Sequence, residues 1–563
     1  MVVRSNSLSR GHSAVSAECI EALLRLVRSE ITPVVPLRGT ISASGDLMPL
    51  AYIAGVIQGN PGVNSRCADG QILTGQQVSE RLGIPPVSLG PKEGLGLVNG
   101  TAASAALASL AMYKTHHLAA VSQVATALTV EALQGSADSF HPFINSIRPH
   151  DGQVEAAGNI LAALRGSRLA QIEGKSKVGL VQDRYSLRTA SQWIGPQLED
   201  LLLADHQITV ELNSTTDNPL INTSTADYYC GGNFQAVSVT SAMEKTRLAL
   251  QMLGRLLYTQ CSESIDPMLN NGLPANLAAD DPSLSFTMKG VDISMASYMS
   301  ELAYLANPVS SHVQTAEMHN QALNSLAFVS ARYTMQAADL VTMMSACSLY
   351  TACQALDLRV LQLSFLDQIP TLLSKTTAEA FGPLADEQLD ALSNSLAASI
   401  KSTWPTTSRL DLHARCTRAV TLAVPILVEH LISASRGNHL FACIPTWQTT
   451  TVQALESTYD ATRAAFFKAP STPSYLGAGS RAIYRAVRQH LGVPFHRGFV
   501  EQPTAGGSLE ANTIEGREKR VTGGWISVLY EALCDGRLGG VVLDALRAGG
   551  HGDGNGGLPG DSA

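Results

Sequence analysis

A short tripeptide, Ala43-Ser44-Gly45, is the first place where the sequence could do chemistry. Two prolines and Gly39 precede it in ITPVVPLRGTISASGDLMPLAYIAG, so the chain must turn before the apolar segment that follows. If the Gly45 nitrogen attacks the Ala43 carbonyl and Ser44 loses its hydroxyl, the backbone becomes an electrophilic methylidene-imidazolone ring. Glycine suits the attacking position because it lacks a Cβ and tolerates strained geometry. Alone, however, Ala-Ser-Gly is a common tripeptide and far more typical of an ordinary tight turn.

A second group, Gln182, Tyr185 and Arg188, recurs every three residues in QDRYSLRTA. If this segment is helical, the three side chains share a face. An arginine there could bind a carboxylate through two parallel hydrogen bonds and so fix a substrate's orientation. The ordinary alternatives are a surface ion pair for the arginine and an amphipathic core position for the tyrosine.

Further polar candidates follow along the chain. Asn99 lies just ahead of Thr101, where it could cap a helix, and Asn218 precedes Pro219, where it could form a turn. Asn320 and Gln321 fall three and four residues after Glu317, which predicts one shared helical face. No histidine spacing indicates a metal site, and GLGLVNG is only a near miss to a dinucleotide fingerprint, so neither metal nor nucleotide is expected.

Composition limits the classes of protein. Only 15% of the 563 residues are charged and 5% are aromatic, which favours closely packed helices and large subunit contacts over a β-sandwich. A net charge of −8 argues against nucleic-acid or anionic-membrane binding. No long uninterrupted apolar segment predicts a membrane span, and nine cysteines without a CxxC pair favour reduced thiols. We therefore expect a cytoplasmic protein.

Proline spacing maps the elements that must position these residues. No proline interrupts residues 92–141, 220–266 or 309–369, so long helices are expected there. Within the last stretch one apolar stripe has helical spacing and is predicted to be core: Ala337, Leu340, Val341, Met344 and Cys347. Strand signals are weak, and the fold class is predicted as mainly α, a bundle of long helices.

We divide the chain into five predicted segments. Residues 1–99 hold the ring-forming tripeptide, and 100–360 form the long-helix core. Residues 361–470, richer in Pro, Ser and Thr, are predicted to be an inserted or appended helical subdomain. Residues 471–548 return to the core, and the glycine-rich tail 549–563 is predicted to be disordered.

Several sequence blocks resemble the aromatic amino acid ammonia-lyase and histidase family, particularly its fungal phenylalanine ammonia-lyases. The signature block is GTISASGDLMPLAYIAG. Further blocks match in family order: RSNSLSRGHSAV, KEGLGLVNGTA, QDRYSLRTASQW, TTDNPLI, GGNFQA, NNGLPANL, DPSLSFTMKGVDISMASYMSEL and HVQTAEMHNQALNSLA. The resemblance extends to about Arg547 and implies the long-helix fold of the ammonia-lyase and fumarase-like superfamily, with residues 361–470 as an additional helical shielding subdomain.

The resemblance also implies an activity and an assembly. The activity is non-oxidative deamination of L-phenylalanine to trans-cinnamate and ammonia, in phenylpropanoid or secondary metabolism. It uses a 4-methylidene-imidazol-5-one formed autocatalytically from Ala43, Ser44 and Gly45. The assembly is a homotetramer in which each active site takes residues from three subunits.

The same resemblance assigns roles to individual residues. Asn99 would hydrogen-bond the ring, and Tyr185 would lie beside it and assist the amine or its proton. The remaining matched residues would bind substrate, with Arg188 and Asn218 at its carboxylate and Lys289 and Glu317 as a charged pair: Gln182, Arg188, Asn218, Phe234, Lys289, Glu317, Asn320 and Gln321.

One departure from the family pattern gives a further expectation. Family members carry, ahead of the RSNSLSRGHS block, a Tyr-Gly loop whose tyrosine is the general base, and no such motif is found here. We therefore expect an N-terminally truncated chain with weak or no activity. Tyrosine ammonia-lyase, phenylalanine aminomutase and an inactive family remnant stay open as alternatives. Histidine ammonia-lyase is disfavoured because its shorter chains should lack the segment 361–470.

Overall fold

A computed structural model describes residues 1–170, 182–382, 386–433, 438–503 and 512–547, so the predicted disordered tail 549–563 lies outside the described residues. The chain forms two compact units. Unit 1 comprises Met1–Ala119, Pro196–Leu253 and Ser300–Val341, and unit 2 comprises Ala120–Gly195, Gly254–Met299 and Thr342–Ala563. The predicted five-segment division is not tested by this partition and stays a prediction.

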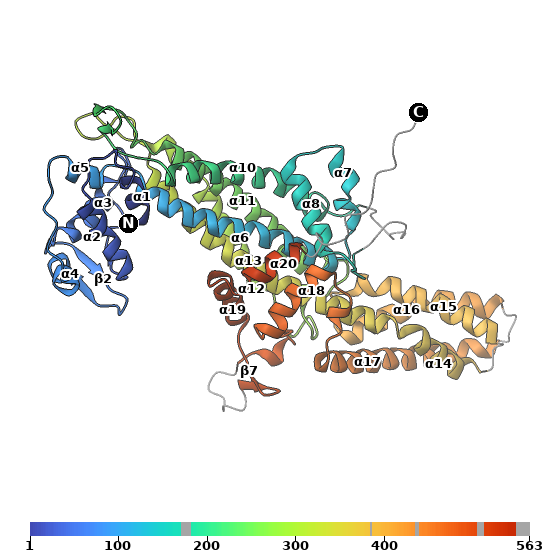
Figure 1. The fold of residues 1–563 in the computed structure, drawn as a ribbon. Coiled ribbons are helices and arrows are strands. Elements are labelled where there is room, and N and C mark those ends of the chain that lie inside the picture. Colours follow the sequence, from blue (N-terminus) through green and yellow to red (C-terminus); the bar gives the residue numbers. More distant parts are fainter. Residues whose placement is uncertain (171–181, 383–385, 434–437, 504–511, 548–563) are drawn as a thin grey trace, which may run out of the picture. The chain divides into compact units, whose positions relative to one another are not determined.

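Long helices dominate the described residues and confirm the mainly-α prediction (Figure 1). Five of them contribute residues to both units: α6 (Ala102–Ala132), α10 (Ala190–Leu212), α11 (Val237–Ile265), α12 (Lys289–Leu305) and α13 (Ala327–Leu366). The stripe predicted within α13 is buried, from Ala337 at 0% exposed to Cys347 at 2%. Helix α13 is buried on nearly all sides, which explains why it is apolar on more than one face.

Unit 1 begins with a small helical region around a three-stranded antiparallel sheet in the order β1-β2-β3. Helix α2 begins after Ser16, whose side chain accepts a hydrogen bond from the Cys19 amide, and its apolar face is buried. Helix α4 begins with a capping box between Thr74 and Gln77 and ends at Gly83 in the left-handed conformation. The elements found only in this unit are α1 (Val2–Leu8), α2 (Ala17–Arg28), β1 (Thr32–Pro33), α3 (Leu47–Ile57), β2 (Asn64–Arg66), β3 (Ile72–Thr74), α4 (Gly75–Leu82), α5 (Glu93–Val98), the β4–β5 hairpin (Leu220–Asn222, Asp227–Tyr229) and the 3₁₀ turn η3 (Ser310–His312).

Unit 2 contains a helical bundle with its own hydrophobic core, in which α14, α15, α16 and α17 pack side by side (Figure 1). Helix α16 is long and apolar enough to span a membrane by length and composition. One face of it, with Cys416, Ala419, Val420 and Leu427, is buried in the bundle core, although only 33% of its apolar window is buried. The elements of unit 2 are α7 (Pro142–Ser146), α8 (Asp151–Ala163), α9 (Tyr185–Arg188), α14 (Ile369–Phe381), α15 (Asp386–Thr403), α16 (Leu412–Ser433), α17 (Ile444–Lys468), α18 (Ala478–Arg485), β6 (Thr513–Ile514), β7 (Arg517–Glu518), α19 (Thr522–Cys534), α20 (Gly539–Arg547) and the short turns η1 (Ala137–Phe140), η2 (Ala275–Leu277), η4 (Trp404–Thr407), η5 (Asn438–Cys443), η6 (Thr472–Ser474), η7 (Ala486–His490) and η8 (Phe499–Glu501).

The longest proline-free stretch is not one helix. Residues 306–326 form a loop between α12 and α13, and α13 begins only at Ala327. Within this loop Glu317, Met318 and His319 have φ angles of 48°, 52° and 73°, in the left-handed region. Three successive left-handed residues cannot continue a right-handed helix, so the stretch is divided without any proline.

Candidate active site

The Ala43-Ser44-Gly45 turn lies against the backbone of Gly100, the residue that follows Asn99. Gly45 and Gly100 form a parallel β-bridge, and the Asp46 amide donates to the Gly100 carbonyl at 2.7 Å. Gly45 has φ +62°, and a Cβ built on it would lie 2.2 Å from both the carbonyl carbon and oxygen of Gly100. No other residue type fits this position without moving the backbone.

Asp46 fixes the turn from one side. Its carboxylate is 0% exposed, accepts from Ser42 Oγ at 2.8 Å, and accepts from the Ser104 amide in the first turn of α6 at 2.6 Å. Burial raises the pKa of Asp46, while the hydrogen bonds from Ser104 and Ser42 oppose that shift. The aspartate that follows the tripeptide therefore connects the turn to α6, a role that the sequence motif did not reveal.

The start of α13 fixes the turn from the other side. Ser325 Oγ donates to the Ser42 carbonyl at 2.7 Å, and the Leu326 amide donates to the Ile41 carbonyl at 2.9 Å. The Phe328 amide donates to Ser42 Oγ at 3.1 Å. The segment before Ser44 is thus hydrogen-bonded to residues almost three hundred positions away.

Asn99 ends α5 and is 2% exposed. Its Nδ2 donates to the Asn218 carbonyl at 3.1 Å, whereas its Oδ1 has no hydrogen-bond partner among the described residues. Asn218 Oδ1 in turn accepts from the Gly231 amide at 2.8 Å. An unpaired buried amide oxygen is costly, and Asn99 Oδ1 is an acceptor that the described residues leave unused.

Arg4 holds this region together and was not predicted as a site residue. It is 1% exposed and donates to the carbonyls of Asn99 at 2.9 Å, Leu97 at 3.1 Å and Thr216 at 2.7 Å, and also to that of Gly96. Burial lowers the pKa of its guanidinium to about 10, and Asp217 opposes that shift. The only sequence signal was its place in the block RSNSLSRGHSAV.

The structure of residues 317–321 shows that the predicted shared helical face is wrong. Glu317, Asn320 and Gln321 do not share a helical face, because they lie in the turn with left-handed φ angles. Asn320 Nδ2 still donates to Glu317 Oε2 at 3.1 Å. Gln321 Nε2 donates to Ser44 Oγ at 3.3 Å, so Gln321 is the member of this group in contact with the tripeptide. Phe234, half-buried in the turn before α11, also belongs to unit 1.

Four predicted residues belong to unit 2. Tyr185 and Arg188 are the first and last residues of α9, with Tyr185 71% exposed and the Arg188 guanidinium carbon 5.0 Å from its ring centroid. Gln182 lies in a bend ahead of α9, so the prediction that it shares a helical face with them is wrong. Lys289 begins α12 and has its Nζ 4.6 Å from the Phe286 ring centroid. The predicted pair of Lys289 and Glu317 falls in different units and stays a prediction.

Helix α9 is attached to the unit 2 part of α11 through its buried residue Ser186. The Ser186 carbonyl accepts from Gln260 Nε2 at 2.9 Å, and Ser186 Oγ donates to Glu263 Oε2. Ser186 and Leu187 are buried, whereas Tyr185 is exposed and Arg188 is half-buried. A half-buried arginine beside an exposed aromatic ring can still bind an aromatic carboxylate on its accessible side.

No group of three or more His, Cys, Asp and Glu side chains that could hold a metal ion occurs in the described ranges. The expectation that no metal is used stays a prediction. The arrangement in unit 1 instead combines a crowded glycine turn, a hydroxyl within hydrogen-bond distance of an amide, and a buried unpaired amide oxygen. These features surround the tripeptide whose closure into a ring the sequence predicts.

Comparison with known proteins gives the family. A family model described as aromatic amino acid lyase matches residues 1–381. A phenylalanine ammonia-lyase of Aspergillus hancockii is 65% identical over 97% of this chain and 79% of its own length. A phenylalanine aminomutase (L-beta-phenylalanine forming) of Talaromyces islandicus is 52% identical over 96% of this chain and 76% of its own.

Solved structures agree with the sequence comparison. The crystal structure of phenylalanine ammonia-lyase from the yeast Rhodosporidium toruloides matches with a TM-score of 0.90 and 42% identity, covering 97% of this chain and 81% of that one. Both the fold and the sequence thus match over nearly the whole chain. The chain belongs to the aromatic amino acid lyase family.

Proposed function

We propose that the protein is a phenylalanine ammonia-lyase, which converts L-phenylalanine to trans-cinnamate and ammonia. The observation that carries this proposal is the 65% identity to an enzyme of that name across 97% of the chain. The crowded Gly45 turn supports it independently, because its geometry suits the backbone chemistry that the resemblance implies.

The residues around the turn fit the prosthetic group that the family resemblance implies. Ala43, Ser44 and Gly45 would supply its atoms, Asn99 Oδ1 lacks a partner among the residues that the structure describes, and Gln321 Nε2 is 3.3 Å from Ser44 Oγ. When formed, a methylidene-imidazolone supplies an electrophile that makes the substrate amine a better leaving group. Gly45 leaves room for this closure since it carries no Cβ between the turn and Gly100.

The remaining residues would bind and orient the substrate. Arg188 would hold the carboxylate through paired hydrogen bonds, with Asn218 as a second donor, and Gln182, Asn320 and Lys289 would line the polar end. Tyr185 would hold or move a proton at the amine, and Phe234 would pack on the aromatic ring. Exposure of Tyr185 supports this role because its hydroxyl is accessible to a bound molecule.

We further propose a cytoplasmic homotetramer whose active sites combine residues of different subunits. Large apolar side chains on the long helices of unit 1 support large subunit contacts, since they are exposed in the single chain: Leu110, Tyr113, Leu202, Val210 and Leu248. The low charged fraction of 15% also supports large subunit contacts, because a chain with few charges must bury much of its surface.

A second candidate, phenylalanine aminomutase, is favoured by the 52% identity to the Talaromyces islandicus enzyme. Product analysis separates the two. We expect purified protein incubated with L-phenylalanine to release trans-cinnamate and ammonia in equal amounts, and to do so slowly if the weak activity expected from the sequence holds. A β-amino acid as the main product would favour the aminomutase, coumarate formed preferentially from tyrosine would favour a tyrosine enzyme, and no product from either amino acid would contradict the proposal.

A further inference from the structure

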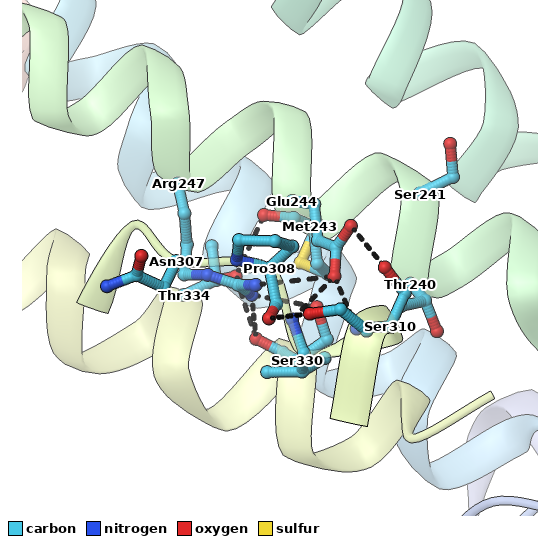
Figure 2. A network of polar contacts seen from close by, with 12 residues as sticks. Thr240, Ser241, Met243, Glu244, Arg247, Asn307, Pro308, Ser310, Ser330 and Thr334 are labelled. Atoms are coloured by element: carbon cyan, nitrogen blue, oxygen red, sulfur yellow. Dashed lines mark hydrogen bonds and ion pairs between the residues drawn. The ribbon is translucent and has the colours of Figure 1, made fainter. Parts of the chain in front are cut away.

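Helix α11 presents three polar side chains along one face, and the proposed function gives none of them a role. Thr240, Glu244 and Arg247 are spaced by four and three residues, which places them on neighbouring turns. Figure 2 shows them directed toward the loop 306–326 and the first turns of α13. That loop carries Glu317, Asn320 and Gln321.

Glu244 binds the beginning of the loop through three hydrogen bonds. Its Oε1 accepts from the amides of Val309 at 2.8 Å and Ser310 at 2.9 Å, and its Oε2 accepts from Ser310 Oγ at 3.1 Å (Figure 2). Hydrogen bonds to a carboxylate are about twice as strong as neutral ones. The carboxylate therefore anchors the point where the chain leaves α12 and enters η3.

Arg247 connects the same face of α11 to α13. It is 0% exposed, and its Nη1 donates to the carbonyl and Oγ of Ser330, both at 2.7 Å, and to Thr334 Oγ1 at 3.2 Å. Its Nε and Nη2 have no hydrogen-bond partner in the part of the chain that the structure describes. Glu244 Oε1 lies 3.9 Å from Nη2, so the anchor also supplies the nearby negative charge for a buried cation.

Thr240 holds the other end of the loop. Its Oγ1 donates to the Ser325 carbonyl at 2.6 Å, and Ser325 Oγ donates to the Ser42 carbonyl at 2.7 Å. One face of α11 thus hydrogen-bonds to the loop at both ends, and Ser325 connects the loop to the ring-forming turn. Between the contacts of Glu244 and Thr240 the loop exposes Glu317 and Asn320. Its Gln321 side chain donates to Ser44.

We propose that Glu244 is a positioning residue, which sets the place of Gln321 and Glu317 relative to Ser44 by fixing the first end of this loop. Its carboxylate contacts the loop backbone and not the tripeptide. The effect on catalysis rests on the proposed lyase function, whereas the effect on the loop does not.

The test compares Glu244→Ala and Glu244→Gln with a matched control, Asp411→Ala. Asp411 accepts from the Ser283 amide at 3.1 Å and from Ser283 Oγ at 2.6 Å, so it anchors a loop of unit 2 in the same way. Amide hydrogen exchange of residues 307–326, the thermal midpoint, and kcat and KM for L-phenylalanine are measured on each purified full chain.

We expect Glu244→Ala to speed exchange in the loop by at least about tenfold, because three hydrogen bonds to a charged group are lost. We also expect kcat/KM to fall on the order of 10²-fold, since a misplacement of about 1 Å in a site has that cost. Glu244→Gln keeps an oxygen acceptor for the two amides. Its loop exchange rate and its kcat/KM should therefore stay close to those of the unsubstituted protein. Asp411→Ala should lower the thermal midpoint to a similar extent while leaving kcat/KM and loop exchange unchanged.

Unchanged exchange at residues 307–326 in Glu244→Ala would overturn the proposal. So would a fall in kcat/KM that Asp411→Ala reproduces at an equal loss of stability, because Glu244 would then act only on global folding. If the unsubstituted protein releases no cinnamate, the proposed function fails, and the exchange comparison still decides whether Glu244 holds the loop.

Discussion

The ring-forming turn of unit 1 and helix α9 of unit 2 contain the two halves of the predicted chemistry, and they are built in opposite ways. Around Gly45 the charged groups that hold the turn are buried and hydrogen-bonded, with Asp46 0% exposed and Arg4 1% exposed. On α9 the predicted functional groups are more accessible, with Tyr185 71% exposed and Arg188 half-buried. Groups that rearrange the backbone need a fixed geometry, whereas groups that bind substrate must stay open to it.

This contrast separates two kinds of mutational effect. Substitutions around the turn should change folding and ring formation, because they disturb packed backbone. Substitutions on α9 should change substrate kinetics alone, because few groups depend on those side chains for their own position.

The largest expected effect is that of Gly45→Ala, which should abolish ring formation. The new Cβ would lie 2.2 Å from the Gly100 backbone. Gly83→Ala is a matched control, because Gly83 also has φ +62° but no described atom lies within 4 Å of its Cβ position. The control should lose only about 1–2 kcal/mol from the left-handed conformation. Intact mass reads out ring formation, and a Gly45→Ala protein that still loses two waters would refute the crowding argument.

The next largest expected effect is on the free energy of unfolding, and it comes from a buried carboxyl group of unit 2. Glu131 is 0% exposed, and burial raises the pKa of its carboxyl to about 7 from an ordinary value of 4.5. The folded state then binds the proton more tightly than the unfolded state, so the free energy of unfolding should be highest below the ordinary value and fall as pH rises to about 7. The total loss is roughly 3 kcal/mol.

Denaturant titrations across that pH range measure this loss. Glu131→Gln should flatten the pH dependence of the unfolding free energy, and the exposed Glu80→Gln should leave it unchanged. An equal slope in Glu131→Gln and the unsubstituted protein would assign the titration to another group.

On α9, Arg188→Lys should lower kcat/KM for L-phenylalanine about 10²-fold, because lysine cannot form the paired hydrogen bonds to a carboxylate. The thermal midpoint should not change. Arg168→Lys is the control, since Arg168 lies over the Tyr475 ring at 4.1 Å as Arg188 lies over Tyr185. A loss of stability in Arg188→Lys, or equal kinetics in both variants, would contradict the proposed open substrate-binding role.

The mainly helical fold class was predictable from the sequence, and so were the buried core positions of α13. The apolar stripe from Ala337 to Cys347 is buried as its spacing indicates. The start of that helix was not predictable, because left-handed φ angles at non-glycine residues such as Glu317 leave no pattern in the sequence. The helical face expected for Glu317, Asn320 and Gln321 failed for this reason, and the one expected for Gln182 failed because α9 begins three residues later.

The candidate site was found mainly through motif resemblance, and its supporting residues were missed. Arg4 donates to Thr216, 212 positions away, and Ser42 contacts residues of α13. Such contacts depend on tertiary packing and cannot be read from local spacing. Local patterns identify which residues can react, while the residues that hold them in place emerge only from the fold.

The most direct test of the central claim is the intact mass of the purified protein, followed by the mass of the peptide that contains residues 43–45. Closure of Ala43, Ser44 and Gly45 into a methylidene-imidazolone predicts a deficit of two water molecules confined to that peptide. A peptide with the full mass of an unmodified serine would contradict the account, whatever product the protein forms.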